Sequence, residues 1–108
     1  MPYVKTAVNV PIPAEKLEVL KARLGKDIAL LGKSESWLMV DFCADSPLYF
    51  KGSPDPAAMV SGAAGDPAYQ RFTEAVTKLL GEQLGIPAGR VFVRYFECNA
   101  WGWNGSNL

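Results

Sequence analysis

Two similar halves follow one another in this chain, and each contains an amphipathic helix between two strands. Apolar residues recur at steps of three and four over 13–31, and Gly32 gives a helix stop. The same period runs over 72–84 and ends at Gly85. Each helix therefore ends in Leu-Gly, and a strand follows a few residues later. This repeat predicts two βαβ units, each joining parallel strands by a right-handed crossover.

Alternating or continuous apolar runs on either side of the helices predict the strands. We expect strands at 3–10, 37–42, 57–64 and 90–96, a brief pairing at 48–50 and a turn at 53–56.

Each helix carries one apolar stripe, so both are expected to cover the same face of the sheet. The other face then carries apolar residues that nothing else in the chain buries, which favours oligomerisation. The fold class we predict is α+β, a two-layer sandwich with two helices on one face of a mixed four-stranded sheet. With 108 residues the chain has the size of one domain, residues 1–108.

Composition excludes several kinds of function. Eleven Lys and Arg residues balance eleven Asp and Glu residues without a basic cluster, so no nucleic-acid partner is expected. The chain has no histidine, which excludes Ser-His-Asp and Cys-His catalysis and histidine-ligated zinc. Cys43 and Cys98 lack CxxC spacing, and we expect no metal and no cofactor. No signal peptide or membrane span is apparent, so we expect a cytoplasmic protein, secreted if at all by a leaderless route, without a membrane partner.

Pro2 directly follows the initiator methionine. A small residue at this position favours removal of Met1, and the mature chain would then begin with a secondary amine. Such an amine is a nucleophile and a general base, and α-amino groups titrate near pH ~8, closer to neutrality than carboxylates or lysines. Proline makes up about 5% of residues and also occurs here by chance, so Pro2 alone does not establish a catalytic amine.

The tail, residues 99–108, has no helical or strand period but contains Trp101 and Trp103. Both tryptophans are expected to dock onto a neighbouring surface or to wall an apolar pocket. The two interpretations agree if the pocket lies at a subunit interface.

Five motifs are spread in register over nearly the whole chain. They are Met1-Pro2 with Val8-Asn9-Val10-Pro11; Leu31-Gly32-Lys33; Phe50-Lys51-Gly52-Ser53-Pro54-Asp55-Pro56; Gly85-Ile86-Pro87 with Arg90-Val91-Phe92-Val93; and Gly102-Trp103-Asn104-Gly105-Ser106. Together they resemble the macrophage migration inhibitory factor family of the tautomerase superfamily.

The resemblance implies a homotrimer whose sheets line a central barrel, with active sites at the subunit interfaces. In that family the N-terminal proline is the base in cofactor-independent keto–enol tautomerisation of phenylpyruvate or dopachrome-type compounds. Pro2 matches this proline, and Lys33 matches a lysine that binds the substrate's carboxylate or enolate oxygen. The other matched positions would contact the substrate or wall its pocket: Ala64, Gly65, Phe92, Arg94, Trp101, Trp103 and Leu108.

Two residues and one short segment depart from the family's pattern. Phe92 replaces a pocket tyrosine and Arg94 its partner asparagine, both supplied by the adjacent subunit. The CxxC of the family's prototype is replaced by Ala57-Ala58-Met59-Val60, so no thiol–disulfide function follows.

The chemistry is consistent with this resemblance. Apolar walls and nearby cations disfavour an ammonium form of Pro2. Lys33 and Arg94 would hold the carboxylate of a small aromatic α-keto acid and stabilise the developing enolate. Without the resemblance, Lys33 could simply close a helix C-terminus and Arg94 could point outward from an alternating strand.

Two alternatives to the tautomerase remain open. One is a cytokine-like, host-modulating protein that binds a receptor with little or no catalysis. The other is addition of water to an unsaturated or halogenated acid. Arg94 is compatible with this reaction, but no water-activating partner stands out in the sequence.

Overall fold

The computed structural model describes residues 2–63, 69–98 and 100–107. Their elements are, in chain order, β1 (Tyr3–Val8), α1 (Ala14–Asp27), β2 (Met39–Cys43), β3 (Ala58–Ala63), α2 (Tyr69–Leu84), β4 (Val91–Phe96), β5 (Gly102–Trp103) and β6 (Ser106–Asn107). Short 3-10 turns lie at Ile28–Leu31, Glu35–Trp37 and Ala88–Arg90. Within this described part, no helix is both long enough and apolar enough to cross a bilayer.

Strands β1 to β4 form one sheet in the order β2-β1-β3-β4. β2 is parallel to β1, β4 is parallel to β3, and the central pair β1 and β3 is antiparallel. In each parallel pair the strands are joined through a helix. The two βαβ units and the mixed four-stranded sheet predicted from the sequence are therefore confirmed.

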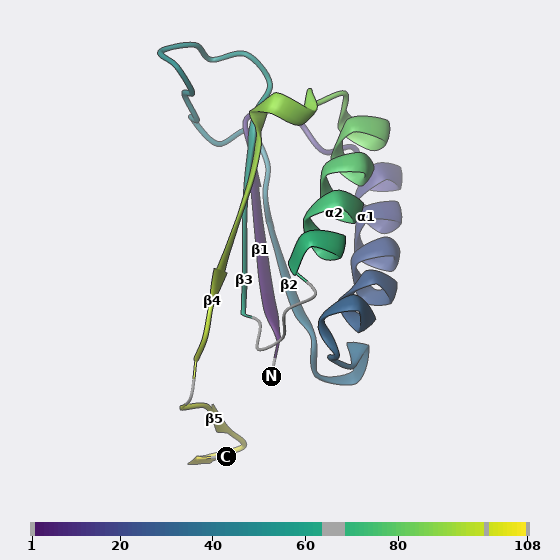
Figure 1. The fold of residues 1–108 in the computed structure, drawn as a ribbon, viewed down its shortest axis with the longest axis vertical. Coiled ribbons are helices and arrows are strands. Elements are labelled where there is room, and N and C mark those ends of the chain that lie inside the picture. Colours follow the sequence, from purple (N-terminus) through teal and green to yellow (C-terminus); the bar gives the residue numbers. More distant parts are fainter. Residues whose placement is uncertain (1, 64–68, 99, 108) are drawn as a thin grey trace.

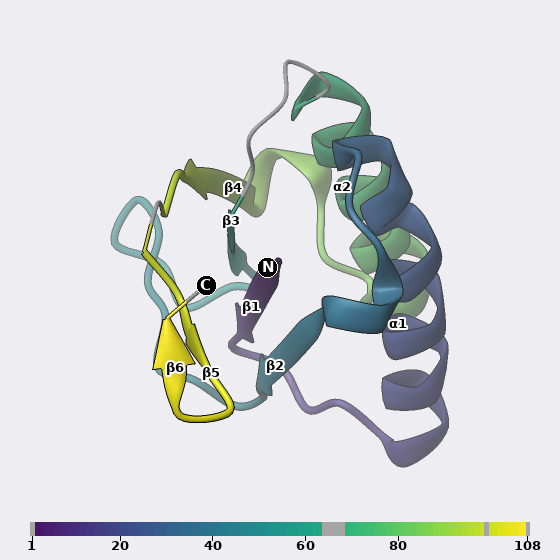
Figure 2. The ribbon, with the colours of Figure 1, turned by 90° about the horizontal axis from the view of Figure 1, so that it is seen from below.

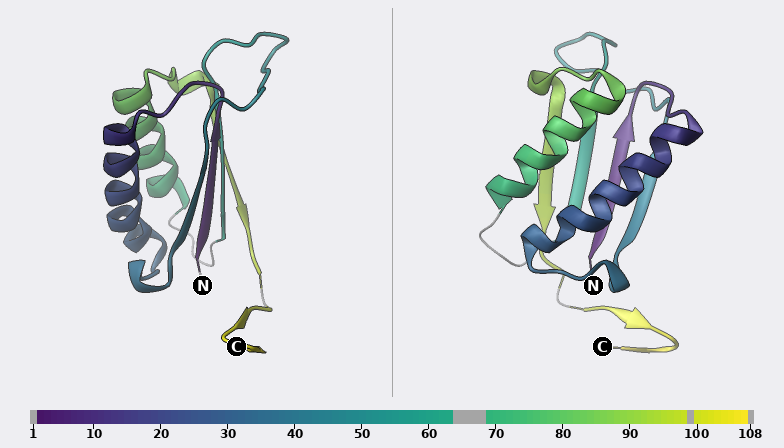
Figure 3. Two further views of the ribbon diagram at one scale, coloured as in Figure 1. Left: turned by 180° about the vertical axis from the view of Figure 1, so that it is seen from behind. Right: turned by 90° about the vertical axis from the view of Figure 1, so that its right-hand side faces the viewer.

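Helices α1 and α2 lie side by side on one face of the sheet (Figures 1 and 3). Alternate residues of β1 face them: Val4, Thr6 and Val8 are almost completely buried. The helix stripes meet this face, and the residues of the core are Val4, Val8, Leu20, Leu24, Ile28, Leu31, Ala58, Val60, Phe72, Val76, Leu79, Leu80 and Ile86. The predicted amphipathic stripes are thus confirmed as core.

No helix of the described residues covers the opposite side of the sheet, and we call this side the open face (Figures 1 and 3). Its residues form rows across the strands, as the strand register shows. One row is polar and consists of Asp41, Lys5, Ser61 and Arg94, and a neighbouring row is largely apolar and consists of Cys43, Ala7, Met59 and Phe92. Large apolar side chains stay exposed on this face, including Met39 (66%), Phe92 (45%) and Phe96 (52%).

Several predicted boundaries were wrong by a few residues. Trp37 does not begin a strand, because it ends a 3-10 turn in which the Ser34 hydroxyl accepts the Ser36 N–H at 3.2 Å; β2 starts at Met39. The pairing expected at 48–50 is a single bridge between Phe50 and Ser53. The tight turn closed by this bridge lies at 51–52, where both residues have positive φ. The turn was predicted later in the chain, at 53–56.

The tail also differs from the prediction, because it contains a small hairpin. β5 pairs with β6 in antiparallel register. Asn104 (φ 52°) and Gly105 (φ 78°) form the turn between them. Positive φ at both central residues is the geometry of a two-residue hairpin turn that favours Asn-Gly. The hairpin lies beyond the N-terminal end of β1, on the side of the sheet away from the helices (Figures 1 and 2).

Candidate active site

A pocket of about 420 Å³ lies next to Pro2, at the end of the sheet where the C-terminal hairpin is found. Pro2 itself is buried. The pocket is walled mainly by apolar and aromatic side chains. We call it the Pro2 pocket, and its lining residues are Pro2, Tyr3, Ser36, Trp37, Leu38, Met39, Trp101 and Trp103.

The parallel pairing of β1 and β2 positions one wall of the Pro2 pocket. The Met39 N–H donates to the Pro2 carbonyl at 3.0 Å, so β2 begins directly beside Pro2. Residues 36–39 were not predicted from the sequence to line a pocket. The predicted βαβ unit contained the signal, because parallel strands begin at the same edge of a sheet.

The tail supplies the opposite wall. Trp103 of β5 packs edge to face on Trp37, with 5.2 Å between the ring centroids. The Trp101 indole N–H donates to the Cys98 carbonyl at 3.1 Å, which fixes the ring near the start of the hairpin. The prediction that Trp101 and Trp103 wall an apolar pocket agrees with this arrangement.

Tyr3 is a further residue that sequence analysis missed. It follows Pro2 directly and lines the same pocket. Its hydroxyl donates to Asp41 Oδ2 at 2.6 Å. This hydrogen bond is the main reason that the pKa of the Tyr3 phenol is raised, and burial is the second. The phenol therefore keeps its proton at neutral pH.

Lys33 is half-buried but does not line the Pro2 pocket in this chain. It follows Gly32, whose left-handed φ of 69° ends the turn Ile28–Leu31, and its N–H donates to the Ile28 carbonyl at 3.3 Å. The connection that contains it continues directly into Ser36 and Trp37, which do line the pocket.

Phe92 and Arg94 lie on β4, at the edge of the sheet away from β2. Phe92 lines a different pocket, of about 290 Å³, together with Phe50, whose ring it meets edge to face at 4.8 Å. Arg94 is exposed on the open face; its Nε–H donates to Ser61 Oγ at 2.8 Å, and its guanidinium lies 4.9 Å from the Phe96 ring centroid. One chain therefore does not bring Phe92 and Arg94 to its own Pro2.

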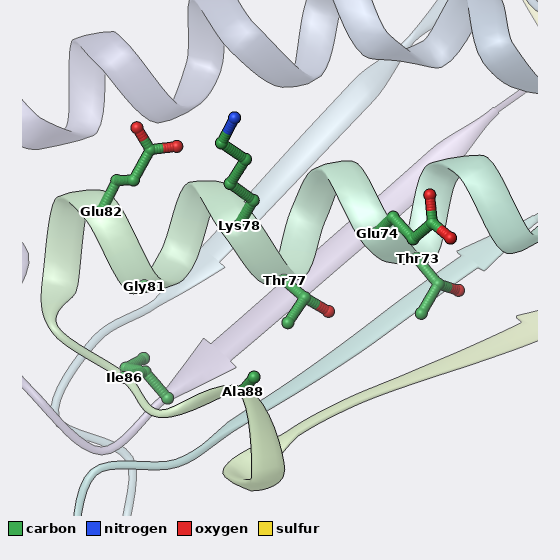
Figure 4. Close-up of a pocket in the computed structure, with 8 residues that line it drawn as sticks. All are labelled: Thr73, Glu74, Thr77, Lys78, Gly81, Glu82, Ile86 and Ala88. Atoms are coloured by element: carbon green, nitrogen blue, oxygen red, sulfur yellow. The ribbon is translucent and has the colours of Figure 1, made fainter.

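Three predicted contacts, Ala64, Gly65 and Leu108, lie outside the described residues. A further hollow of about 520 Å³ runs along the outer side of α2, between Thr73, Thr77 and Ile86 (Figure 4). It contains none of the predicted site residues. Within the described ranges, no group of three or more Cys, Asp or Glu side chains is placed to hold a metal ion.

Solved structures share this fold along the whole chain. Leishmania major MIF2 superposes with a TM-score of 0.90 at 34% identity, covering 100% of this chain and 97% of that one. A macrophage migration inhibitory factor homologue from Prochlorococcus marinus gives a TM-score of 0.87 at 29% identity, covering 97% of both chains. The chain therefore has the tautomerase fold, the class to which these structures belong.

Sequence comparison defines the family more closely. The family model for macrophage migration inhibitory factor (MIF) matches residues 1–108. The macrophage migration inhibitory factor of Xenopus laevis is 33% identical over 117 aligned positions, covering 100% of this chain and 99% of that protein. The chain belongs to the macrophage migration inhibitory factor family. Membership supports a tautomerase or cytokine function of the MIF type, and proteins of this fold generally form homotrimers.

Proposed function

We propose that this protein is a cofactor-independent keto–enol tautomerase, with the amine of a mature N-terminal Pro2 as the general base. The observation that carries the proposal is the position of Pro2, buried in a pocket with tryptophan and aliphatic walls. An amine among apolar walls loses solvation of its ammonium form, so its pKa falls and it is a free base nearer neutral pH. Proton abstraction next to a carbonyl requires a base of this kind.

Small aromatic α-keto acids such as phenylpyruvate fit the walls of the pocket best. An aromatic ring would pack against Trp37 and Trp103, which already meet edge to face. The carboxylate and the developing enolate oxygen need cations, and Lys33 stands in the connection that leads into the pocket wall.

The second cation would be Arg94 of an adjacent copy, together with Phe92 of that copy. Both side chains lie on the open face, at the edge away from the Pro2 pocket. The Nε–H of Arg94 donates to Ser61 Oγ. The two terminal nitrogens of the Arg94 guanidinium remain, and they have the geometry to bind a carboxylate in a bidentate manner. We therefore propose a homotrimer with shared sites, which would also cover exposed Met39 and Phe96.

The test of the base is phenylpyruvate keto–enol conversion from about pH 5 to about pH 9. The reference is protein shown by intact mass to begin at Pro2. We expect Pro2→Ala to lose roughly 100-fold or more in kcat, the usual contribution of a general base. Protein that retains Met1 is a matched control, because its Pro2 nitrogen is an amide and cannot accept a proton. An inactive reference would overturn the phenylpyruvate proposal and favour a cytokine-like binding function.

Shared sites can be tested by mixing two variants. Pro2→Ala replaces the secondary amine that is the proposed base with a primary one, and Arg94→Ala lacks the guanidinium that a neighbouring copy would provide. Unfolded, mixed and refolded together, they form sites that join an intact Pro2 to an intact Arg94. Random assortment restores about one quarter of the sites if each site is shared by two copies. No recovery above the sum of the separate variants would show that each chain acts alone.

A further inference from the structure

We propose that Tyr3 and Asp41 form a positioning pair that holds the Tyr3 ring as a fixed wall of the Pro2 pocket and sets its affinity for aromatic substrates. The proposal rests on the proposed function, because it concerns the same pocket. Asp41 itself does not line the pocket; it would act through Tyr3.

The hydrogen bond between the pair is short and charge-assisted. The phenol donates to Asp41 Oδ2 at 2.6 Å, within the range of strong O–H···O⁻ bonds. The bond joins two strands, β1 and β2, at residues 38 positions apart in the chain. It therefore ties the second residue of the mature chain to the rest of the sheet.

The strand register shows which way the bond directs the ring. Tyr3 is paired with Met39, and Asp41 is paired with Lys5, one step further along the open face. The Tyr3 side chain therefore leans along β1, away from the end of the sheet where Pro2 lies. Without the bond, a rotation at χ1 would let the ring swing toward the pocket. The hydrogen bond keeps the ring as a wall and prevents it from filling the space that a substrate ring needs.

The charges around the pair determine which variant tests it best. Lys5 is the cross-strand neighbour of Asp41, and Arg94 ends the same polar row on β4. Removal of the Asp41 charge leaves Lys5 unbalanced, which would attract a carboxylate substrate and oppose the effect of a displaced ring. Tyr3→Phe keeps every charge and the ring while it removes the hydroxyl, so it is the decisive variant.

The experiment measures phenylpyruvate binding by calorimetry in the Pro2→Ala background, and kcat and KM in protein with Pro2 intact. We expect Tyr3→Phe to weaken binding and raise KM by roughly three- to tenfold, the range of one ordinary hydrogen bond, because only part of the effect on the ring position is transmitted to the substrate. The value of kcat stays within about twofold, because the base is untouched. Asp41→Asn keeps an acceptor for the phenol, and because it also removes the charge beside Lys5, it should bind phenylpyruvate at least as tightly as wild type. Asp41 is half-buried, and Asp55→Asn, which removes a charge from an exposed carboxylate elsewhere, is the control for loss of a charge as such.

A double variant completes the test. If the two side chains act as one unit, Tyr3→Phe with Asp41→Ala is no worse than the weaker-binding single variant. Wild-type affinity in a folded Tyr3→Phe protein, or additive losses in the double variant, would overturn the proposal. If Asp41→Ala does not fold, Tyr3→Phe decides alone. An inactive wild type that still binds phenylpyruvate more tightly than Tyr3→Phe would refute the proposed function and leave the pair intact.

Discussion

Asn9 connects the end of β1 to the long loop between β2 and β3, and its replacement by Asp gives a sharp test of this fold. Its Nδ2 donates to the carbonyl oxygens of Leu48 (3.1 Å), Pro54 (3.0 Å) and Asp55 (2.9 Å). Its Oδ1 accepts the Ala57 N–H at 2.7 Å. Asn9→Asp keeps the size and this acceptor, but it puts an oxygen without hydrogens against three carbonyl oxygens.

The expected loss follows from the donors removed. An amide NH₂ has two hydrogens, so the three carbonyls share about two good bonds. At a net value of about 1 kcal/mol each, their loss costs about 2 kcal/mol. Carboxylate and carbonyl oxygens left without donors add about 1 kcal/mol, the low end of the usual range, because Asn9 is only half-buried and water reaches it. We expect Asn9→Asp to lower the free energy of unfolding by about 3 kcal/mol.

Urea denaturation near neutral pH, followed by circular dichroism, measures this loss. One oxygen of the new carboxyl faces three carbonyl oxygens in the folded state, which raises its pKa there, so the deficit should shrink as the pH falls through that pKa. Asn107→Asp makes the same chemical change at an exposed position of β6 and should shift stability by less than about 0.5 kcal/mol. A loss below about 1 kcal/mol for Asn9→Asp would refute the reasoning, since it would mean that the amide contributes no more than one ordinary bond.

Two further changes test the packing of β4 and the tail. Tyr95→Phe removes the bonds of its hydroxyl to Thr73 Oγ1 (2.7 Å) and the Tyr69 carbonyl (3.0 Å) and should cost about 1 kcal/mol in urea at neutral pH. Burial raises the pKa of Tyr95 and outweighs the opposing effect of the Thr73 hydrogen bond. The wild type should therefore lose more stability than the variant as the pH rises above about 10. Equal losses would contradict this. Gly105→Ala should strain the hairpin turn by about 1 kcal/mol, because the φ of +78° is unfavourable for alanine. An added Cβ would meet no neighbour, so the backbone angle alone sets this cost. The near-ultraviolet dichroism of the tryptophans should then fall, whereas Gly89→Ala, also in open space, should leave it unchanged.

The local pattern of the sequence was sufficient to predict the fold. Helical period and the Leu-Gly stops predicted both helices, and the repeat of the halves predicted the paired βαβ units. The errors lie where the local structure is determined by single residues that do not belong to the helical or strand pattern. The Ser34 cap makes a 3-10 turn of 35–37, and the left-handed residues at 51–52 close the loop early. The hairpin of the tail was missed although Asn104-Gly105 is a strong turn signal, because its strands are too short to show alternation.

The site was harder to predict than the fold. Pro2, Trp101 and Trp103 meet in one pocket as expected, but Trp37 and Met39 enter it through the pairing of β2 with β1. Periodicity assigned those residues to a strand and gave no indication of what they face. The Tyr3–Asp41 bond was equally invisible, since it depends on a diagonal neighbour across two strands.

The distribution of the expected site residues over the sheet implies that, if Arg94 holds the substrate carboxylate as proposed, a second copy of the chain must supply it. The base and the aromatic walls gather where β1 and β2 begin, whereas Arg94 and Phe92 lie on β4, and β1 and β3 separate this strand from β2. Strands in a sheet are spaced by about 4.8 Å, so β4 lies about 14 Å from β2, beyond the reach of an arginine to a carboxylate held near the β2 wall. A second copy that brings its β4 edge against the β2 edge of the first would remove this distance. Assembly and substrate binding would then depend on the same surface, and dilution that separates the copies should abolish activity before it unfolds the chain.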